Sequence, residues 1–146
     1  MTATDRRPPF RFAHRTRVGF DETDAQGVVY YGRYMPYFDR ARVEYLRSLG
    51  LLHERGGDSD FVIRAQAVEY HAPAQFDDEL EVFVRVRRIG TTSVGWEFVA
   101  YNVATGERLS TATQAMVHIA LPARRPHPIG ERYRAIIRQF EQELEE

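Results

Sequence analysis

The sequence contains no cysteine and no long apolar run. Without cysteine the chain has no disulfide, no thiolate metal ligand and no Cys nucleophile, so any catalysis depends on other side chains. No stretch approaches the ~18 consecutive apolar residues of a membrane span, and Met1–Arg17 lacks the continuous apolar segment of a signal peptide. We therefore expect a soluble, cytoplasmic protein.

An excess of charge of one sign is also missing. The 20 Lys plus Arg residues nearly balance the 21 Asp plus Glu residues, which leaves a formal net charge of -1. Because nucleic-acid binding depends on a positive field, we expect no nucleic-acid partner. The spacing of the five histidines is not typical of metal ligands, so no metal site is expected; they are His14, His53, His71, His118 and His127.

The composition that is present fits one globular domain, since 43% of the 146 residues are hydrophobic. We interpret residues 1–9 as a flexible N-terminal arm and residues 10–146 as a single domain. A long helix is predicted within Tyr30–Leu51 by apolar residues at helical spacing, namely Tyr34, Phe38, Ala41, Tyr45 and Leu49. Pro36 is tolerated in a first helical turn, which places the start near Tyr34, and Gly50 fits the C-terminal stop.

Alternating apolar residues predict strands before and after this helix in the sequence. The first lies within Phe10–Phe20, and four more follow within Phe61–Tyr70, Leu80–Arg87, Val94–Ala100 and Thr113–Leu121. Short connections between them predict antiparallel hairpins in succession, and Ile129–Leu144 predicts a C-terminal helix. The result is an α+β fold, with an antiparallel sheet of about five strands wrapped around the long central helix. Its uncovered face and edges favour at least a dimer.

The densest chemical signal is the segment Gly19–Tyr31, which joins the first strand to the helix. Asp24 precedes Gly27 by three positions, and the chain then enters a helix whose first backbone N–H groups lack intrahelical acceptors. Such donors can polarise a carbonyl oxygen and stabilise the charge that develops on it during acyl transfer. Asp24 also fits a purely structural turn residue, and Asp21 and Glu22 fit turn structure and solvation.

Several stretches resemble the signature segment of 4-hydroxybenzoyl-CoA thioesterases and the related acyl-CoA thioesterases of the Tol-Pal gene cluster. They are DAQGVVYY at Asp24–Tyr31, Tyr34, FDRAR at Phe38–Arg42 and LGL at Leu49–Leu51. Ala72–Leu80 is similar to the connection between the second and third strands of that family, so the resemblance spans Phe10–Leu121. It implies a hot-dog fold and no cofactor beyond the coenzyme A of the substrate.

The resemblance also implies roles for particular residues. Asp24 matches the catalytic carboxylate, as nucleophile or general base, and Tyr31 matches the residue whose backbone N–H contacts the thioester carbonyl. Gly27 and Val28 would contact the substrate beside them. In this family the site lies at a dimer interface, where Phe61, Val62 and Ile63 of the partner subunit would close the acyl pocket. Whether such dimers pair into tetramers is open.

The coenzyme A contacts of the family fall on the hairpin that matches Arg87–Ser93. This chain has Gly90 and Thr91 where many relatives carry basic residues, so Arg88, Thr92 and Ser93 are the expected contacts. Arg33 is a second departure, because relatives often have Asn there.

Three other functions are alternatives to acyl-CoA hydrolysis. An acyl-carrier-protein thioesterase would use the same chemistry, and a non-catalytic acyl-CoA-binding module would hold the thioester without cleaving it. The dehydratases of this fold use a His in the catalytic segment, and none lies between His14 and His53. The identity of the acyl group does not follow from the sequence.

Overall fold

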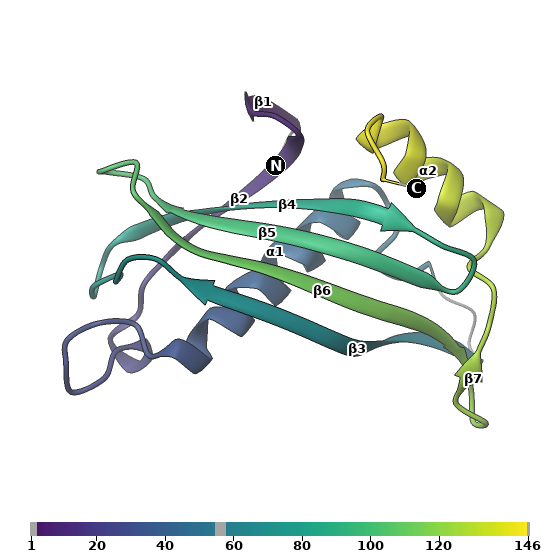
Figure 1. The fold of residues 1–146 in the computed structure, drawn as a ribbon, viewed down its shortest axis with the longest axis horizontal. Helices are drawn as coiled ribbons and strands as arrows, with labels where there is room; N and C mark the ends of the chain where they lie inside the picture. The colour runs from purple at the N-terminus through teal and green to yellow at the C-terminus, as the bar shows by residue number, and fades with distance from the viewer. Residues whose placement is uncertain (1–2, 55–57, 146) are drawn as a thin grey trace.

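The computed structural model describes residues 3–54 and 58–145, which form a curved sheet packed on one long helix (Figure 1). The strands are β1 (Ala3–Arg7), β2 (Phe10–Arg17), β3 (Ser59–Tyr70), β4 (Glu79–Ile89), β5 (Ser93–Asn102), β6 (Arg108–Ala120) and β7 (Arg125–Pro126). The helices are α1 (Tyr34–Ser48) and α2 (Glu131–Glu141), with 3-10 turns η1 (Phe20–Glu22) and η2 (Tyr31–Arg33). Across these residues, none of the helices is long and apolar enough to cross a membrane.

The central helix α1 confirms the prediction from apolar spacing. It begins at Tyr34, with Pro36 in its first turn, and it ends before Gly50, whose φ of 72° is a conformation that glycine adopts readily. The helix crosses one face of the sheet, and its inner side is fully or almost fully buried; these residues are Tyr34, Tyr37, Phe38, Ala41 and Tyr45. The predicted hot-dog arrangement of helix and sheet is therefore confirmed.

The order of strands in the sheet is β1-β2-β4-β5-β6-β3, with β7 paired to β6. The expectation of hairpins in succession is wrong for β3 and β4, because β3 pairs with β6 along its whole length. Backbone hydrogen bonds tie the connection between them to other segments, from Val29 N to Ala74 O (2.8 Å) and from Val18 N to Asp78 O (2.9 Å). The chain thus crosses to β2 before β4 begins, and β3 becomes a long edge strand.

The predicted arm contains a strand in the structure. Residues 3–7 form β1, which pairs with β2 and lies over the face of the sheet opposite α1. Apolar side chains cluster on that face, and they are Phe10, Ala13, Phe83 and Val99, with Tyr101 at their margin. The Arg7 guanidinium lies 3.6 Å from the centroid of the Tyr101 ring, where a cation interacts favourably with the π-system. The arm therefore covers apolar surface on the outer face of the sheet.

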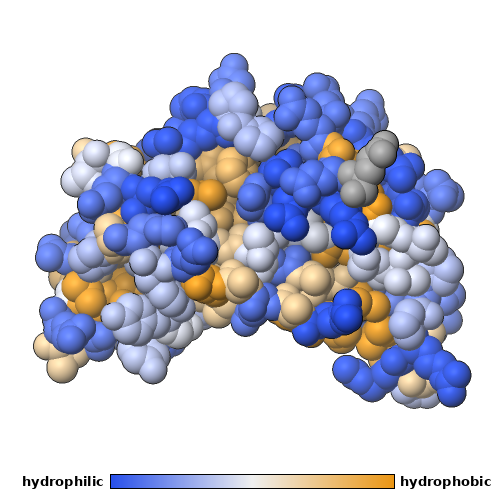
Figure 2. All heavy atoms as spheres, in the orientation of Figure 1, coloured by the Kyte–Doolittle hydropathy of each residue, from blue (hydrophilic) through white to orange (hydrophobic). Residues whose placement is uncertain are grey.

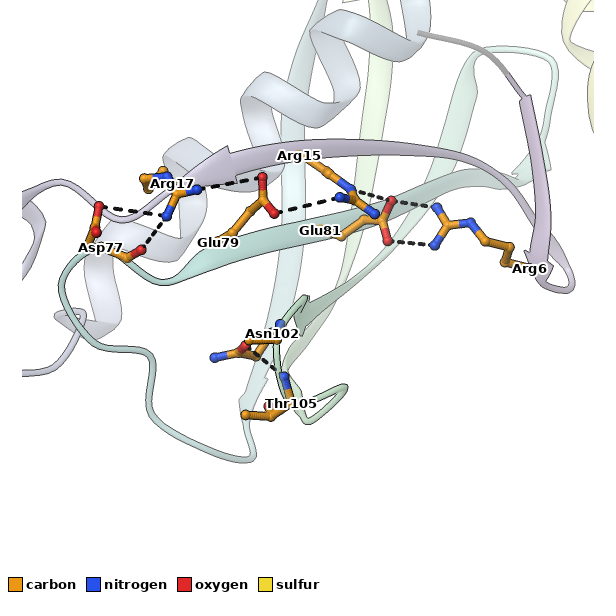
Figure 3. A network of polar contacts seen from close by, with 9 residues as sticks. Arg6, Arg15, Arg17, Asp77, Glu79, Glu81, Asn102 and Thr105 are labelled. Carbon is orange, nitrogen blue, oxygen red and sulfur yellow. Dashed lines mark hydrogen bonds and ion pairs between the residues drawn. The ribbon is translucent and has the colours of Figure 1, made fainter.

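A network of ion pairs fixes the same region (Figure 3). Glu81 accepts hydrogen bonds from Arg6 at 2.5 and 2.9 Å and from Arg15 at 3.4 Å, so that one carboxylate joins β1, β2 and β4. The bond from Arg6 is the main cause that lowers the pKa of Glu81. At the other end of this network, Arg17 donates a hydrogen bond to the Asp77 carbonyl oxygen at 2.7 Å.

The C-terminal helix α2 packs at the end of the sheet opposite the Asp24 loop (Figure 1). Its last residue, Glu141, is 1% exposed, and its Oε2 accepts hydrogen bonds from the Tyr45 hydroxyl and from Val86 N. Burial is the main cause that raises the pKa of Glu141 to about 7. The acidic end of the chain thus includes a buried carboxyl group.

Candidate active site

A tight turn carries Asp24 at the end of the sheet where α1 begins. Thr23 and Val29 form an antiparallel bridge, Asp24 N donates to Val28 O at 2.9 Å, and Gly27 N donates to Asp24 O at 2.9 Å. Gly27 has a φ of 78°, which side chains other than glycine rarely adopt. The glycine three positions after Asp24 therefore closes the turn.

The carboxyl group of Asp24 is half-buried and engages the turn with only one oxygen. Oδ1 accepts a hydrogen bond from Gln26 N at 2.8 Å, a common local bond for Asp in turns. Oδ2 has no hydrogen-bond partner among residues 3–54 and 58–145. A role of Asp24 in the turn thus explains the hydrogen bond of one carboxylate oxygen, and the other oxygen remains free to accept a proton or attack a carbonyl carbon.

Glu22 anchors the Asp24 turn to the central helix. Its Oε1 accepts hydrogen bonds from Gly19 N at 2.7 Å and from the Tyr37 hydroxyl at 2.9 Å, and its backbone oxygen accepts one from Tyr30 N at 3.1 Å. Glu22 serves turn structure as expected, but it is 8% exposed rather than solvated. Burial, followed by the bond to Glu22, raises the pKa of Tyr37.

The helix start offers two amides that point away from the helix body. Arg33 N donates to Tyr30 O at 2.9 Å, and Tyr34 N donates to Tyr31 O, so hydrogen bonding in the turn begins with these two residues. The N–H groups of Tyr31 and Gly32 donate to no acceptor within the described part of the chain. The predicted free donor at Tyr31 is therefore present, together with a second one at Gly32.

A cavity of about 400 Å³ opens beside these amides. It is lined by Gln26, Val28, Val29, Tyr31, Tyr34, Tyr70, His71, Ala72 and Pro73. Of the predicted site residues, Val28 and Tyr31 line this cavity, whereas Asp24 and Gly27, which belong to the turn before Val28, are not among its lining residues. Sequence reasoning missed Tyr70, because nothing in the alternation of β3 shows that its last residue meets the helix start.

The predicted acyl-pocket residues Phe61, Val62 and Ile63 lie at the other end of β3. Nine residues of strand at ~3.3 Å each separate Phe61 from Tyr70, so one chain cannot bring both to the same cavity. Phe61 instead packs against the rings of His118 (4.8 Å) and Tyr133 (5.2 Å). Only a second copy could place its own Phe61 beside Tyr70.

The predicted coenzyme A contacts lie around the β4–β5 hairpin. Arg88 and Ser93 line a cavity of about 340 Å³ together with Arg64 and Arg87. Thr92 is not among its lining residues, and its carbonyl accepts His118 N at 2.7 Å. Two of the three expected residues, Arg88 and Ser93, thus share one cavity with two further arginines, and one of these, Arg87, forms an ion pair with Glu145 at 3.2 Å. The described residues contain no group of three His, Cys, Asp or Glu side chains that could hold a metal ion.

The sequence matches a known protein family. The model of the thioesterase superfamily matches residues 26–108. The acyl-CoA thioester hydrolase YbgC of Escherichia coli is 40% identical over 88 residues, which cover 57% of this chain and 63% of YbgC, so the chain matches just under two thirds of that relative.

Solved structures agree in fold. A thioesterase-superfamily protein from Jannaschia matches with a TM-score of 0.84 at 24% identity, over 96% of this chain and 89% of that protein. Slr0204 from Synechocystis, a 1,4-dihydroxy-2-naphthoyl-CoA thioesterase, matches with a TM-score of 0.79 at 23% identity, over 86% of this chain and 94% of that protein. At these identities the likeness concerns the fold alone. Since the superfamily model covers more than half of its residues, this chain belongs to the thioesterase superfamily.

Proposed function

We propose that this chain hydrolyses acyl-CoA thioesters to a carboxylic acid and free coenzyme A. The observation that carries the proposal is that one short segment bears both chemical parts. It holds Asp24, with one carboxylate oxygen unpaired in the described structure, and the unpaired amides of Tyr31 and Gly32, and Tyr31 lines a cavity. The likeness to a relative named as an acyl-CoA thioester hydrolase supports a coenzyme A ester as the substrate.

The amides would bind the thioester carbonyl oxygen and stabilise the negative charge that forms there when the carbonyl carbon is attacked. Asp24 can then act in either of two ways. As a general base it takes a proton from water while the water oxygen bonds to the carbonyl carbon; the C–S bond breaks, and coenzyme A leaves with the proton. As a nucleophile its carboxylate oxygen bonds to the carbonyl carbon while the C–S bond breaks, which gives an acyl anhydride and the coenzyme A thiolate. Water then hydrolyses the anhydride to the carboxylic acid and the free Asp24 carboxylate, and the thiolate takes up the proton that is released.

A second copy of the chain would complete the site through β3. This edge strand is twelve residues long, and apolar side chains are exposed along it, including Ile63, Ala65 and Ala67. Figure 2 shows hydrophobic side chains along the margin of the molecule where β3 runs. Antiparallel pairing of two β3 strands would bury this edge and bring Phe61 of one copy toward Tyr70 of the other.

The coenzyme A phosphates would bind beside the β4–β5 hairpin. Guanidinium groups bind phosphate oxygens with paired hydrogen bonds. Arg88 is exposed and shares its cavity with Arg64, Arg87 and Ser93, which supports the expected contacts at Arg88 and Ser93. Thr92 is the weakest of the three, because its backbone is already paired to β6.

The test is hydrolysis of a panel of aryl, short-chain and long-chain acyl-CoAs by the wild type and by Asp24→Asn. We expect the substitution to lower kcat by on the order of 10²-fold or more, because it removes the base or nucleophile. Asp21→Asn is the matched control, since Asp21 is an exposed carboxylate in the same loop. Undiminished turnover by Asp24→Asn would refute the role, and tight acyl-CoA binding by a wild type without turnover would favour a binding module.

A further inference from the structure

Tyr70 links the open edge of the sheet to the start of the central helix. Its hydroxyl donates a hydrogen bond to the Tyr31 carbonyl oxygen at 3.2 Å. Its ring lies 4.9 Å from the Tyr31 ring and 5.7 Å from the Tyr34 ring, and all three side chains line the same cavity. The contact therefore joins the last residue of β3 to the peptide that holds one of the two free amides.

The hydrogen bond from Tyr70 to the Tyr31 carbonyl also affects the Gly32 N–H, because both groups belong to the same peptide. In a trans peptide the C=O and N–H groups point in opposite directions, so the group that holds the Tyr31 carbonyl also sets the direction of the Gly32 N–H. The carbonyl accepts two hydrogen bonds, one from Tyr34 N in the helical turn and one from Tyr70. Bonds accepted at a carbonyl polarise the peptide and strengthen the N–H of the same unit as a donor.

The Tyr70 contact is not required by burial. In the single chain Tyr70 is 45% exposed, and the Tyr31 carbonyl already has a backbone partner, so neither group depends on this bond to be hydrogen-bonded there. A structural role would therefore gain little from this bond. Its effect falls instead on the Gly32 N–H of the same peptide, which donates to no acceptor in the described structure.

We propose that Tyr70 is a positioning residue that orients and polarises the Gly32 N–H as a second hydrogen-bond donor to the thioester carbonyl, beside the Tyr31 N–H. The inference rests on the proposed hydrolase function and adds Tyr70 to it. Gly32 touches the substrate carbonyl, and Tyr70 acts through the Tyr31–Gly32 peptide. The bond between Tyr70 and Tyr31 also couples the donor to β3, the strand that a second copy would pair with.

The test is Tyr70→Phe, which keeps the ring in the cavity and removes only the hydroxyl. Loss of a whole oxyanion donor lowers kcat by ~10²- to 10³-fold, and a polarising bond contributes roughly 10 to 30% of a hydrogen bond. On a logarithmic scale the expected fall in kcat is about 2- to 8-fold, with KM changed by less than about 2-fold. Tyr101→Phe is the matched control, because Tyr101 lies on the outer face and its hydroxyl makes no hydrogen bond in the part of the chain described.

Each outcome bears on the proposal. A fall confined to kcat in Tyr70→Phe, with Tyr101→Phe at wild-type rate, supports it. Wild-type kcat in Tyr70→Phe, or a change confined to KM, overturns it and leaves the proposed function intact if Asp24→Asn is inactive. A wild type that hydrolyses no thioester overturns both together.

Discussion

The buried carboxyl of Glu141 makes the stability of this protein depend on pH, in a direction opposite to that of most carboxylates. Burial raises its pKa from 4.5 to about 7, although the Tyr45 hydroxyl, Val86 N, Arg85 and Arg11 all favour the ionised form. The second oxygen, Oε1, is buried and has no partner among the described residues. The proton therefore belongs to the folded state at mildly acidic pH.

The sign of the effect follows from proton linkage. Between pH 4.5 and about 7 the folded state holds a proton on Glu141 that the unfolded state has lost, so the free energy of unfolding falls as pH rises through this window. The contribution is complete below pH 4.5 and is lost above pH 7. At ~1.4 kcal/mol for each pKa unit, the loss is about 3 kcal/mol.

Urea unfolding of the wild type and Glu141→Gln at pH 5 and pH 8 measures this loss. Gln keeps an oxygen for the Tyr45 and Val86 bonds and cannot ionise, so we expect the decline in unfolding free energy between the two pH values to shrink by about 2 to 3 kcal/mol, since part of the loss has already occurred at pH 5. Glu143→Gln, at an exposed position of the same segment, should keep the wild-type decline. An equal decline in wild type and Glu141→Gln would refute the reasoning.

Two further substitutions probe the turn and the edge strand. Gly27→Ala should destabilise the fold by about 1 kcal/mol in thermal unfolding, because the φ of Gly27 is 78°, although no atom crowds the position. Gly130→Ala is the control: Gly130 has a φ of -62° and equally open space, so its substitution should lower the stability far less. Equal losses of stability in the two variants would contradict the argument from backbone strain. Ile63→Arg should shift the expected dimer toward monomer in analytical ultracentrifugation, because it places charge on the exposed β3 edge, whereas Ile63→Val should not; an unchanged dimer would show that the copies associate elsewhere.

The sequence predicted the elements of this fold better than their pairing. The start and end of α1 could be predicted from Pro36 and Gly50, because each restricts or frees the backbone at its own position. The spacing of the apolar residues in α1 determines which face of the helix is buried. Alternation in β3 predicts a strand but carries no information on its partner. Its pairing with β6 joins residues that are distant in the sequence, such as Val62 and Val117.

The same distinction applies to the candidate site. The turn around Asp24 and the unpaired amides of the helix start could be expected because a turn followed by a helix start is a local pattern, whereas the roles predicted for Asp24, Gly27 and Tyr31 are implied by the family resemblance. Tyr70 and Glu141 could not be identified, because each owes its role to a residue about 40 or more positions away. An exposed-looking Tyr at a strand end and a Glu near an acidic terminus have no sequence signal that separates them from their solvated neighbours.

The most direct measurement is a crystal structure with a ketone analogue of an acyl-CoA, in which a methylene group replaces the thioester sulfur. The account predicts the ketone oxygen about 2.7 to 3.1 Å from the N–H nitrogens of Tyr31 and Gly32, with the Asp24 carboxylate facing the carbonyl carbon. A ketone bound away from these amides, or an Asp24 side chain turned from it with both oxygens bonded within its own turn, would contradict the account.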